Sequence, residues 1–185
     1  MSVFGDGLDA AVQKAFTRPA PKSAPAQMRY LVRQLKSTKA VAQMLRVSQR
    51  TVERYVKDQI KKPRPDLAAR LEAEVKKRWQ PQIRAKARQK AATTDGIVID
   101  TRARIGYTAP IGTTDEDRLR HLTVALPPRY AARLFDAQEQ GASDQQLQQI
   151  AAEALKEVYF QDNGRRAGQL EQVRFTDIEH LEFDL

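Results

Sequence analysis

Apolar residues recur at the spacing of an α-helix through the first half of the chain. Over residues 27–36, apolar side chains fall at positions i, i+3, i+4 and i+7, which form one face of a helix. A longer stripe repeats every four residues from Leu67 to Ile83. Asp66 would cap that second helix, and Pro81, which has no amide hydrogen to donate, would break it near Lys77.

The second half begins with a different pattern, in which apolar and polar residues alternate. This period of two predicts a half-buried strand over residues 97–107, and the alternation returns over residues 122–126. The two strands can pair as an antiparallel hairpin. Their connection, residues 108–120, is long for a hairpin, and connections of this length are often functional.

Two helices and a strand-like tail follow the predicted hairpin. The first helix is expected over residues 128–140. The second opens on a capping box at residues 143–146 and ends at Asn163 and Gly164. Apolar residues alternate again over residues 173–185, which predicts one or two further short strands. The expected fold class is therefore α+β.

The segment between the first two helical stripes is typical of a helix-turn-helix that binds DNA. Its helices would cover residues 39–45 and 49–58, joined by a turn through residues 46–48. Ser48 can cap the second helix, whereas Arg46 occupies a turn position where glycine is common and predicts a strained or alternative turn. The positions where the two helices must cross are apolar: Val41, Leu45, Val47 and Val52.

The second of these helices turns a polar surface outward that suits base edges and phosphates. Residues 76–90 add seven lysine and arginine residues with no acid among them. A phosphate backbone would neutralise such a run, although a solvated basic face is the ordinary alternative. Trp79 could stack on a base or pack in the protein, and packing is favoured. The residues predicted to contact DNA are Gln49, Arg50, Thr51, Arg54, Lys57, Lys61, Lys62, Lys76, Lys77 and Arg78.

Charge is segregated along the chain, which indicates a nucleic-acid-binding part joined to a part with another task. Residues 1–92 hold 22 Lys and Arg against 7 Asp and Glu, whereas residues 93–185 hold 10 against 16. We therefore predict an N-terminal amphipathic helix with a proline-rich linker over residues 1–26, packed in a core. A helix-turn-helix domain over residues 27–92 and a smaller α+β domain over residues 93–185 would follow.

Several classes of protein are excluded by composition. The chain has no cysteine, so it has no disulfide framework, zinc ribbon or thiol chemistry. No apolar run approaches the ~20 residues of a membrane span, which predicts a soluble, cytoplasmic protein on the nucleoid. The two histidines, His121 and His180, have no paired ligand spacing, and no catalytic triad is visible. The sequence thus predicts neither an enzyme nor an intrinsic cofactor.

Beyond these patterns, the whole chain resembles the terminal proteins that cap the telomeres of linear actinobacterial (Streptomyces-type) chromosomes and plasmids. The resemblance is carried by the opening residues 4–8, by residues 39–57 and 96–108, and by Gly112-Thr113-Thr114-Asp115. It implies a protein that becomes covalently joined to the 5′ DNA end and primes the filling of the recessed telomere. It also implies three partners, which are telomeric DNA (duplex and single-stranded or folded 3′ overhang), a helper protein and a DNA polymerase that brings Mg²⁺ or Mn²⁺.

The resemblance places the linkage residue at Thr114, within the long connection between the predicted strands. Thr113 is the immediate alternative. A second Thr-Thr-Asp sequence, at residues 93–95, is a further candidate for the linkage that the sequence alone does not eliminate. Asp115 and Asp117 would orient the hydroxyl or cap the following element. A homodimer is possible. Two other functions remain compatible with the residues: a helix-turn-helix transcriptional regulator and a nucleoid architectural protein.

Overall fold

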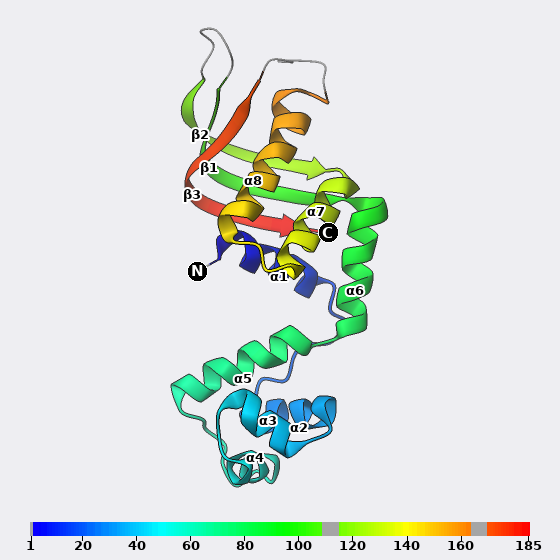
Figure 1. The fold of residues 1–185 in the computed structure, drawn as a ribbon, viewed down its shortest axis with the longest axis vertical. Coiled ribbons are helices and arrows are strands. Elements are labelled where there is room, and N and C mark those ends of the chain that lie inside the picture. The colour runs from blue at the N-terminus through cyan, green and yellow to red at the C-terminus, as the bar shows by residue number, and fades with distance from the viewer. Residues whose placement is uncertain (1, 109–114, 164–169) are drawn as a thin grey trace. The chain divides into compact units, whose positions relative to one another are not determined.

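The computed structural model describes residues 2–108, 115–163 and 170–185, with the backbone alone for Asp115 and Glu116. The fold is α+β, as predicted, and the described residues form eight α-helices and three strands (Figure 1). The chain divides into two compact units. We call Thr17–Pro81 the helical unit, and Met1–Phe16 together with Gln82–Leu185 the sheet unit.

The helical unit contains four helices around one apolar core. They are α2 (Ala24–Leu35), α3 (Thr38–Leu45), α4 (Gln49–Val56) and α5 (Pro65–Arg78). The helices predicted over this part of the chain are confirmed, with ends that differ by at most three residues from the prediction. The core side chains come from all four helices and are almost fully buried: Met28, Leu31, Val41, Leu45, Val52, Tyr55, Leu71 and Val75.

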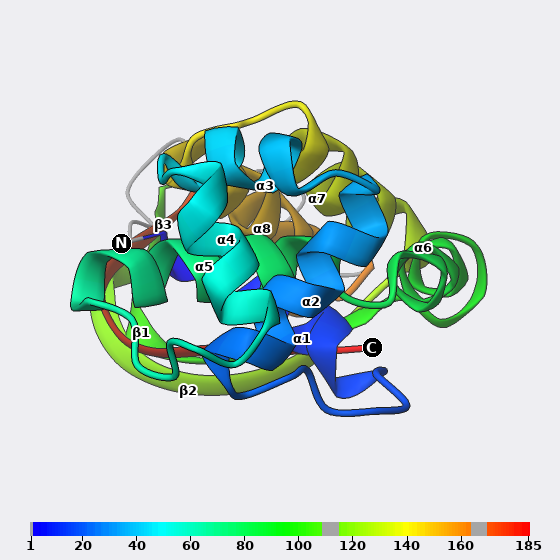
Figure 2. The same ribbon diagram turned by 90° about the horizontal axis from the view of Figure 1, so that it is seen from below.

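The sheet unit is built on an antiparallel sheet with strand order β2-β1-β3. The strands are β1 (Ile97–Thr108), β2 (Asp115–Leu126) and β3 (Gln172–Asp184). Helices α1 (Val3–Lys14), α7 (Pro128–Glu139) and α8 (Asp144–Leu155) cover one face, and Figure 2 shows the strands curving along one side of them. Helix α6 (Pro81–Lys90) and π-helical turns at Ala91–Asp95 and Lys156–Phe160 complete the unit.

The alternation predicted for β1 is confirmed. Ile97, Ile99, Ala103 and Ile105 are buried among the helices, and the polar side chains between them point to the opposite face. The capping box is also present, because Ser143 accepts from the amide of Gln146 while the Gln146 side chain accepts from the amide of Ser143. Local sequence signals therefore account for the alternation of β1 and the start of α8.

The boundaries of the two units differ from those of the predicted domains. The N-terminal helix packs in a core, as expected, but that core belongs to the sheet unit, where Phe4 and Leu8 are buried. Residues 82–92 also belong to the sheet unit because Ala91 is buried in the same core. The predicted helix-turn-helix domain over residues 27–92 was therefore too long at its C-terminal end. The α+β unit is the larger of the two, not the smaller.

Two element boundaries differ from their predictions for local reasons, and a third agrees. Helix α5 begins at Pro65 after Arg64, so Asp66 lies inside its first turn and does not cap it. The helix ends at Arg78, which confirms the predicted break near Lys77. Gln80, whose φ is 46°, separates it from α6, where Pro81 is tolerated as the first residue. Strand β2 starts at Asp115, so the connection between the strands is residues 109–114 and not 108–120.

The tail forms a single strand of 13 residues, where one or two short strands were predicted. Strand β3 runs alongside β1 over its whole length, with register shifts next to Ala103. Asp177 has a φ of 48° at this point, so the strand bends without ending. The last helix was expected to end at Asn163. Helix α8 ends at Leu155, and the π-helical turn that follows it ends at Phe160.

Candidate nucleic-acid interface

The turn between α3 and α4 is formed by a left-handed residue and a helix cap. Arg46 adopts the left-handed conformation, with φ 53° and ψ 48°, and ends α3 while the next amide, that of Val47, donates to Ala42 over 2.9 Å. This is the strained turn that the sequence predicted, because a residue with a Cβ is disfavoured in this region. Ser48 then accepts from the amide of Thr51 over 3.2 Å and caps α4.

The turn fixes which side of α4 faces the core. Val52 and Tyr55 are buried against α2 and α3, so the opposite side of the helix is exposed. Arg50, Arg54 and Lys57 lie on that exposed side, and none of them forms an ion pair with any residue that the structure describes. Three cations without an acidic partner on one short helix are a surface suited to an anionic ligand.

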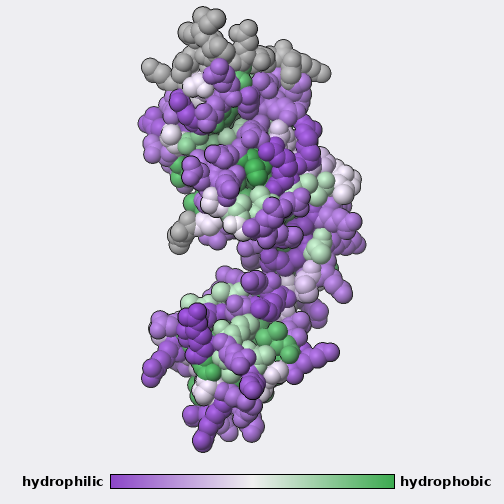
Figure 3. Space-filling view, in the orientation of Figure 1, coloured by the Kyte–Doolittle hydropathy of each residue, from purple (hydrophilic) through white to green (hydrophobic). Residues whose placement is uncertain are grey.

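Charge in the whole helical unit agrees with this local arrangement. It contains 17 lysine and arginine residues against 5 aspartate and glutamate residues, a net charge of +12. Hydrophilic side chains cover the lower end of this unit in Figure 3, where Figure 1 places α4. The sheet unit carries the remaining 15 basic and 18 acidic residues, a net charge of −3.

On α4, two of the predicted DNA-contacting residues have protein partners. The Gln49 side chain donates to Thr38 over 3.1 Å and to Glu53 over 3.0 Å, so it ties α4 to α3. The Thr51 hydroxyl lies 2.8 Å from that of Ser48. These bonds hold Gln49 and Thr51 in fixed orientations at the start of α4, where they position the helix.

The predicted basic run at the end of α5 is partly neutralised by acids one turn earlier. Lys76 lies 2.9 Å from Glu72, and Arg78 pairs with Glu74. Lys77 is exposed and forms no ion pair with the described residues. Lys61 and Lys62, which follow α4, are likewise exposed and have no ion-pair partner in the described part of the chain.

The two arginines of the run on α6 have a structural role in the sheet unit. Arg84 donates to Asp9 over 2.8 Å, and its side chain is only 14% exposed. Arg88 donates to Glu139 over 2.6 Å and lies over the ring of Phe135. The seven charges therefore do not form one phosphate-binding surface, because acids distant in sequence neutralise part of them.

Trp79 packs within the protein, as favoured from the sequence. Its ring lies 4.9 Å from that of Tyr30 in an edge-to-face arrangement, and its indole nitrogen donates to the carbonyl of Arg18 over 3.0 Å. Tyr30 in turn donates to the carbonyl of Arg78 over 2.5 Å. These contacts hold the end of α5 against α2 and the linker before it.

The predicted linkage residues Thr113 and Thr114 lie outside the described residues, between the end of β1 and the start of β2. The alternative pair is described. Thr93 donates to the carbonyl of Gln89 over 2.8 Å, and the hydroxyl of Thr94 lies 3.3 Å from that of Thr93. Both threonines are exposed on the π-helical turn after α6, next to α7.

The acidic residues after Thr114 belong to a strand. Asp117 is part of β2 and accepts from the hydroxyl of Thr176 over 3.1 Å, while Arg174 lies 3.7 Å away. Both of these partners come from β3, on the far side of β1. Asp117 therefore links the two outer strands from within β2, so it does not cap a following element. Its expected role in orienting the Thr114 hydroxyl stays a prediction.

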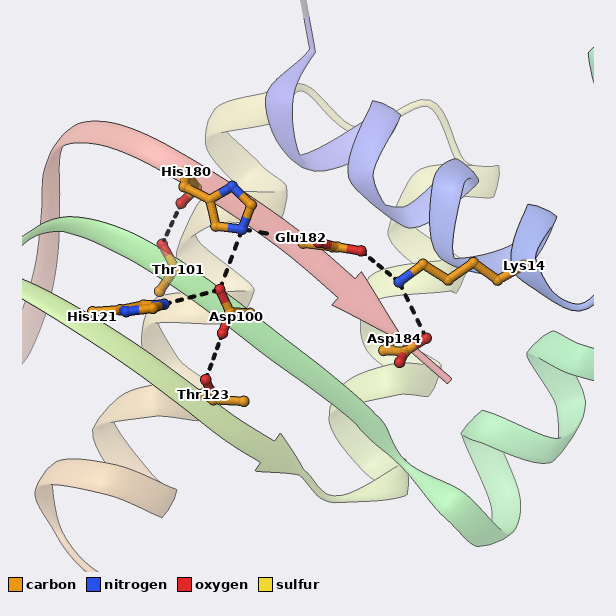
Figure 4. Close-up of polar contacts among 8 residues, drawn as sticks. All are labelled: Lys14, Asp100, Thr101, His121, Thr123, His180, Glu182 and Asp184. Carbon is orange, nitrogen blue, oxygen red and sulfur yellow. Dashed lines mark hydrogen bonds and ion pairs between the residues drawn. The ribbon is translucent and has the colours of Figure 1, made fainter.

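A polar cluster that the sequence did not predict lies on the face of the sheet opposite the helices (Figure 4). Asp100 Oδ1 lies 3.3 Å from His121 Nε2 and 3.2 Å from His180 Nε2, and Thr123 donates to Oδ2 over 2.5 Å. The hydrogen bond from Thr123 lowers the pKa of Asp100, burial opposes it, and His121 and His180 add to the lowering, so the net pKa lies below its usual value.

Strand register explains why this convergence was invisible in the sequence. Residues 121 and 180 both lie opposite Arg102, one on each side of β1. Lys14, at the end of α1, extends the cluster by bonding Glu182 over 2.5 Å. Among the residues that the structure describes, no group of three potential ligand side chains is placed to hold a metal ion.

Compared with known families, curated proteins and solved structures, this chain has no significant match. In the described ranges, no helix has both the length and the apolar character that crossing a membrane requires.

Proposed function

We propose that this chain is a telomere terminal protein, which binds the ends of a linear replicon and primes DNA synthesis from its own side chain. The exposed, unpaired cations of α4 are the observation that carries the DNA-binding part. The resemblance of the chain to the terminal proteins carries the priming part. Its partners would be telomeric DNA, a telomere-associated helper protein and a DNA polymerase.

The DNA-binding part follows from the chemistry of α4. Arg50 and Arg54 are one helical turn apart on the exposed side, and a guanidinium can donate two parallel bonds to the major-groove edge of guanine. Lys57, Lys61 and Lys62 continue the surface beyond the helix, where ammonium groups would contact phosphates. Binding by this surface would weaken as salt rises, because each phosphate contact releases counterions.

The priming part requires a single hydroxyl presented to a polymerase. The Thr114 Oγ1 would attack the α-phosphorus of a deoxynucleoside triphosphate, forming a P–O bond as the bond to pyrophosphate breaks. The hydroxyl proton passes to a base in the polymerase site, and Mg²⁺ or Mn²⁺ bound there stabilises the entering and leaving oxygens. The new 3′-hydroxyl on the attached nucleotide is then extended. The chain itself supplies no catalytic residue.

Nucleotide transfer tests the proposal directly. Purified protein, polymerase, helper and telomeric DNA are mixed with an α-³²P-labelled deoxynucleotide, and the labelled peptide is mapped. We expect label on Thr114, none in Thr114→Ala, and normal labelling in Thr113→Ala, Thr93→Ala and Thr94→Ala. DNA binding should survive in all four variants. Normal labelling of Thr114→Ala would reject the site, and no labelling of any variant or of the parent would reject the function.

A transcriptional regulator is the second candidate, because α3 and α4 alone would serve one, with the sheet unit as a dimerisation or effector part. A nucleoid architectural protein is the third, favoured only by the excess of positive charge. Protein recovered from cells distinguishes them. A nucleotide adduct on a threonine peptide is expected of a terminal protein and of neither alternative. An architectural protein would also bind all DNA sequences and ends equally.

A further inference from the structure

Tyr159 lies on the surface although its spacing would bury it. The buried stripe of α8 repeats every four residues through Leu147, Ala151 and Leu155. Residue 159 is the next position of that stripe in a continuous α-helix. Its side chain is nevertheless 42% exposed, one of the few large apolar residues in the described chain with that exposure.

A π-helical turn causes this displacement. Residues Lys156–Phe160 follow α8 with one extra residue in the turn, and the amide of Gln161 donates to the carbonyl of Lys156, five residues earlier, over 2.8 Å. One added residue rotates the side chains that follow by roughly 100° about the helix axis. The rotation directs Phe160 to Tyr107, with 5.5 Å between ring centroids, and leaves Tyr159 outside. Turns of this kind are frequent at functional sites.

The exposed ring is supported by other aromatic rings and by a cation. Tyr159 and Phe160 are 5.0 Å apart with an interplanar angle of 87°, so Phe160 covers at most one face of Tyr159. The guanidinium of Arg120 lies 5.6 Å from the centroid of Phe160 and donates to the carbonyl of Ile105. The three rings run from solvent to the end of β1.

The nearby acid is already compensated. Glu157, two residues before Tyr159, pairs with Arg129 and accepts from the Tyr130 hydroxyl over 2.6 Å. Lys156 donates to the carbonyl of Glu171 over 2.9 Å and adds a positive charge next to the turn. Lys156 lies three residues before the exposed ring, Glu157 is paired, and Asp162, three residues after the ring, also has an interaction partner within the chain. The ring therefore suits an aromatic anion more than an apolar peptide.

From these observations we infer that Tyr159 is a stacking platform for an unpaired base of single-stranded DNA. This inference rests on the proposed function, in which the chain meets a 3′ overhang. It also gives the sheet unit a DNA contact of its own, since Tyr107 belongs to the strand that leads to the proposed linkage segment. Stacking tolerates any base, so this contact would recognise single strands without selecting a sequence.

Photochemical cross-linking of the full chain tests the platform without polymerase or nucleotide. A short oligodeoxynucleotide carrying 5-iododeoxyuridine is irradiated with the protein, and the cross-linked peptide is identified by mass. We expect the cross-link on Tyr159. We also expect Tyr159→Ala to weaken single-stranded binding by about tenfold and to leave duplex binding unchanged, whereas Tyr159→Trp retains both. Leu119→Ala is the control, because Leu119 is 46% exposed on a strand of the same unit.

Three results would overturn the platform. They are unchanged single-stranded affinity in Tyr159→Ala, a cross-link confined to other residues, and an equal loss of duplex and single-stranded binding. The last would mean that the substitution acts through the fold. The outcome is separate from nucleotide transfer. A cross-link on Tyr159 with no labelling of Thr114 would reject the proposed function alone, and labelled Thr114 without the cross-link would reject the platform alone.

Discussion

The carboxylate of Asp144 accepts a 2.8 Å hydrogen bond from the backbone amide of Phe4, 140 residues earlier in the chain. The amides of Val3 and Gly5 and the hydroxyl of Ser2 donate to the same carboxylate. The first amides of a helix have no partners within it, so Asp144 supplies to α1 what a capping residue usually supplies from its own helix. This bond explains why the N-terminal helix belongs to the sheet unit.

Asp144→Ala should therefore destabilise the sheet unit by about 1 kcal/mol, the usual effect of removing a helix cap. Urea unfolding followed by circular dichroism would measure it, and hydrogen exchange at the amide of Phe4 would locate it. Gln145→Ala is the matched control, because Gln145 is its exposed neighbour on α8. Unchanged stability and unchanged exchange at Phe4 would contradict this, because they would mean that hydrogen bonds from these amides to water are as favourable as those to Asp144.

The same carboxylate makes stability depend on pH. Burial raises the pKa of Asp144, but the bonds from Ser2 and the three amides outweigh it, so the net pKa lies below its usual value. A lowered pKa means that the carboxylate stabilises the fold above about pH 4 and that this contribution is lost as pH falls through the folded pKa. The stability difference between the parent and Asp144→Asn should shrink in acid. Unfolding curves from pH 7 to pH 2.5 would check this, and a constant difference would contradict it.

Arg50→Ala and Arg54→Ala should each weaken specific DNA binding by about tenfold and reduce discrimination between sites, since each removes a potential base contact. Fluorescence anisotropy with telomeric and unrelated duplexes would measure both effects. Arg70→Ala is the control, because Arg70 is exposed on α5 in the same unit and away from α4. An equal loss for both duplexes would assign the two arginines to phosphate contacts, and no loss would remove α4 from the interface.

The basic residues that end α5 should differ in effect. Lys77→Ala is expected to reduce the salt dependence of binding by about one phosphate contact, whereas Lys76→Ala should do less, since Lys76 is paired with Glu72. Affinity measured across a salt series would give the slopes. Removing Lys76, Lys77 and Arg78 together should lower affinity and flatten the slope. An unchanged slope in that triple variant would assign the segment to solvent.

Elements with strong local signals could be predicted from the sequence. Ser48 and the residues of the capping box mark helix starts by their own hydrogen bonds, and the alternation from Ile97 to Ile105 marks a strand that is buried on one side. The outward cations of α4 followed from helical spacing alone. These features depend on neighbours within a few residues, which a sequence displays directly.

Features that depend on distant partners could not be predicted in the same way. Arg84 looked like part of a phosphate-binding run, but Asp9 neutralises it across 75 positions of sequence. His121 and His180 looked unrelated because their meeting at Asp100 depends on the register of two strand pairs. The displacement of Tyr159 could not be predicted for another reason. A π-helical turn changes the helical period, and no proline or glycine marks its position in the sequence.

Substitution of Gly96 tests how closely the start of β1 packs against the end of β2. Gly96 precedes β1 with a φ of 77°, and a Cβ placed on it would lie 2.2 Å from the carbonyl oxygen of Leu126, the last residue of β2. That oxygen belongs to the backbone, so it cannot move aside without shifting the end of a strand. The ψ of Gly96 is −157°, a backbone conformation that essentially only glycine adopts, so Gly96→Ala should cost roughly 1–3 kcal/mol in backbone strain and the displacement of Leu126 as well.

Gly141→Ala separates the clash from the backbone strain. Gly141 has nearly the same φ, 79°, but its added Cβ would meet nothing within 4 Å. This variant should lose only the cost of its positive φ, whereas Gly96→Ala should lose more, because its backbone conformation and the carbonyl of Leu126 both oppose a Cβ. Thermal and urea unfolding of both variants would compare them. Equal losses would show that the end of β2 yields to a methyl group, and the anchoring of β1 beside it would then be looser than the contact implies.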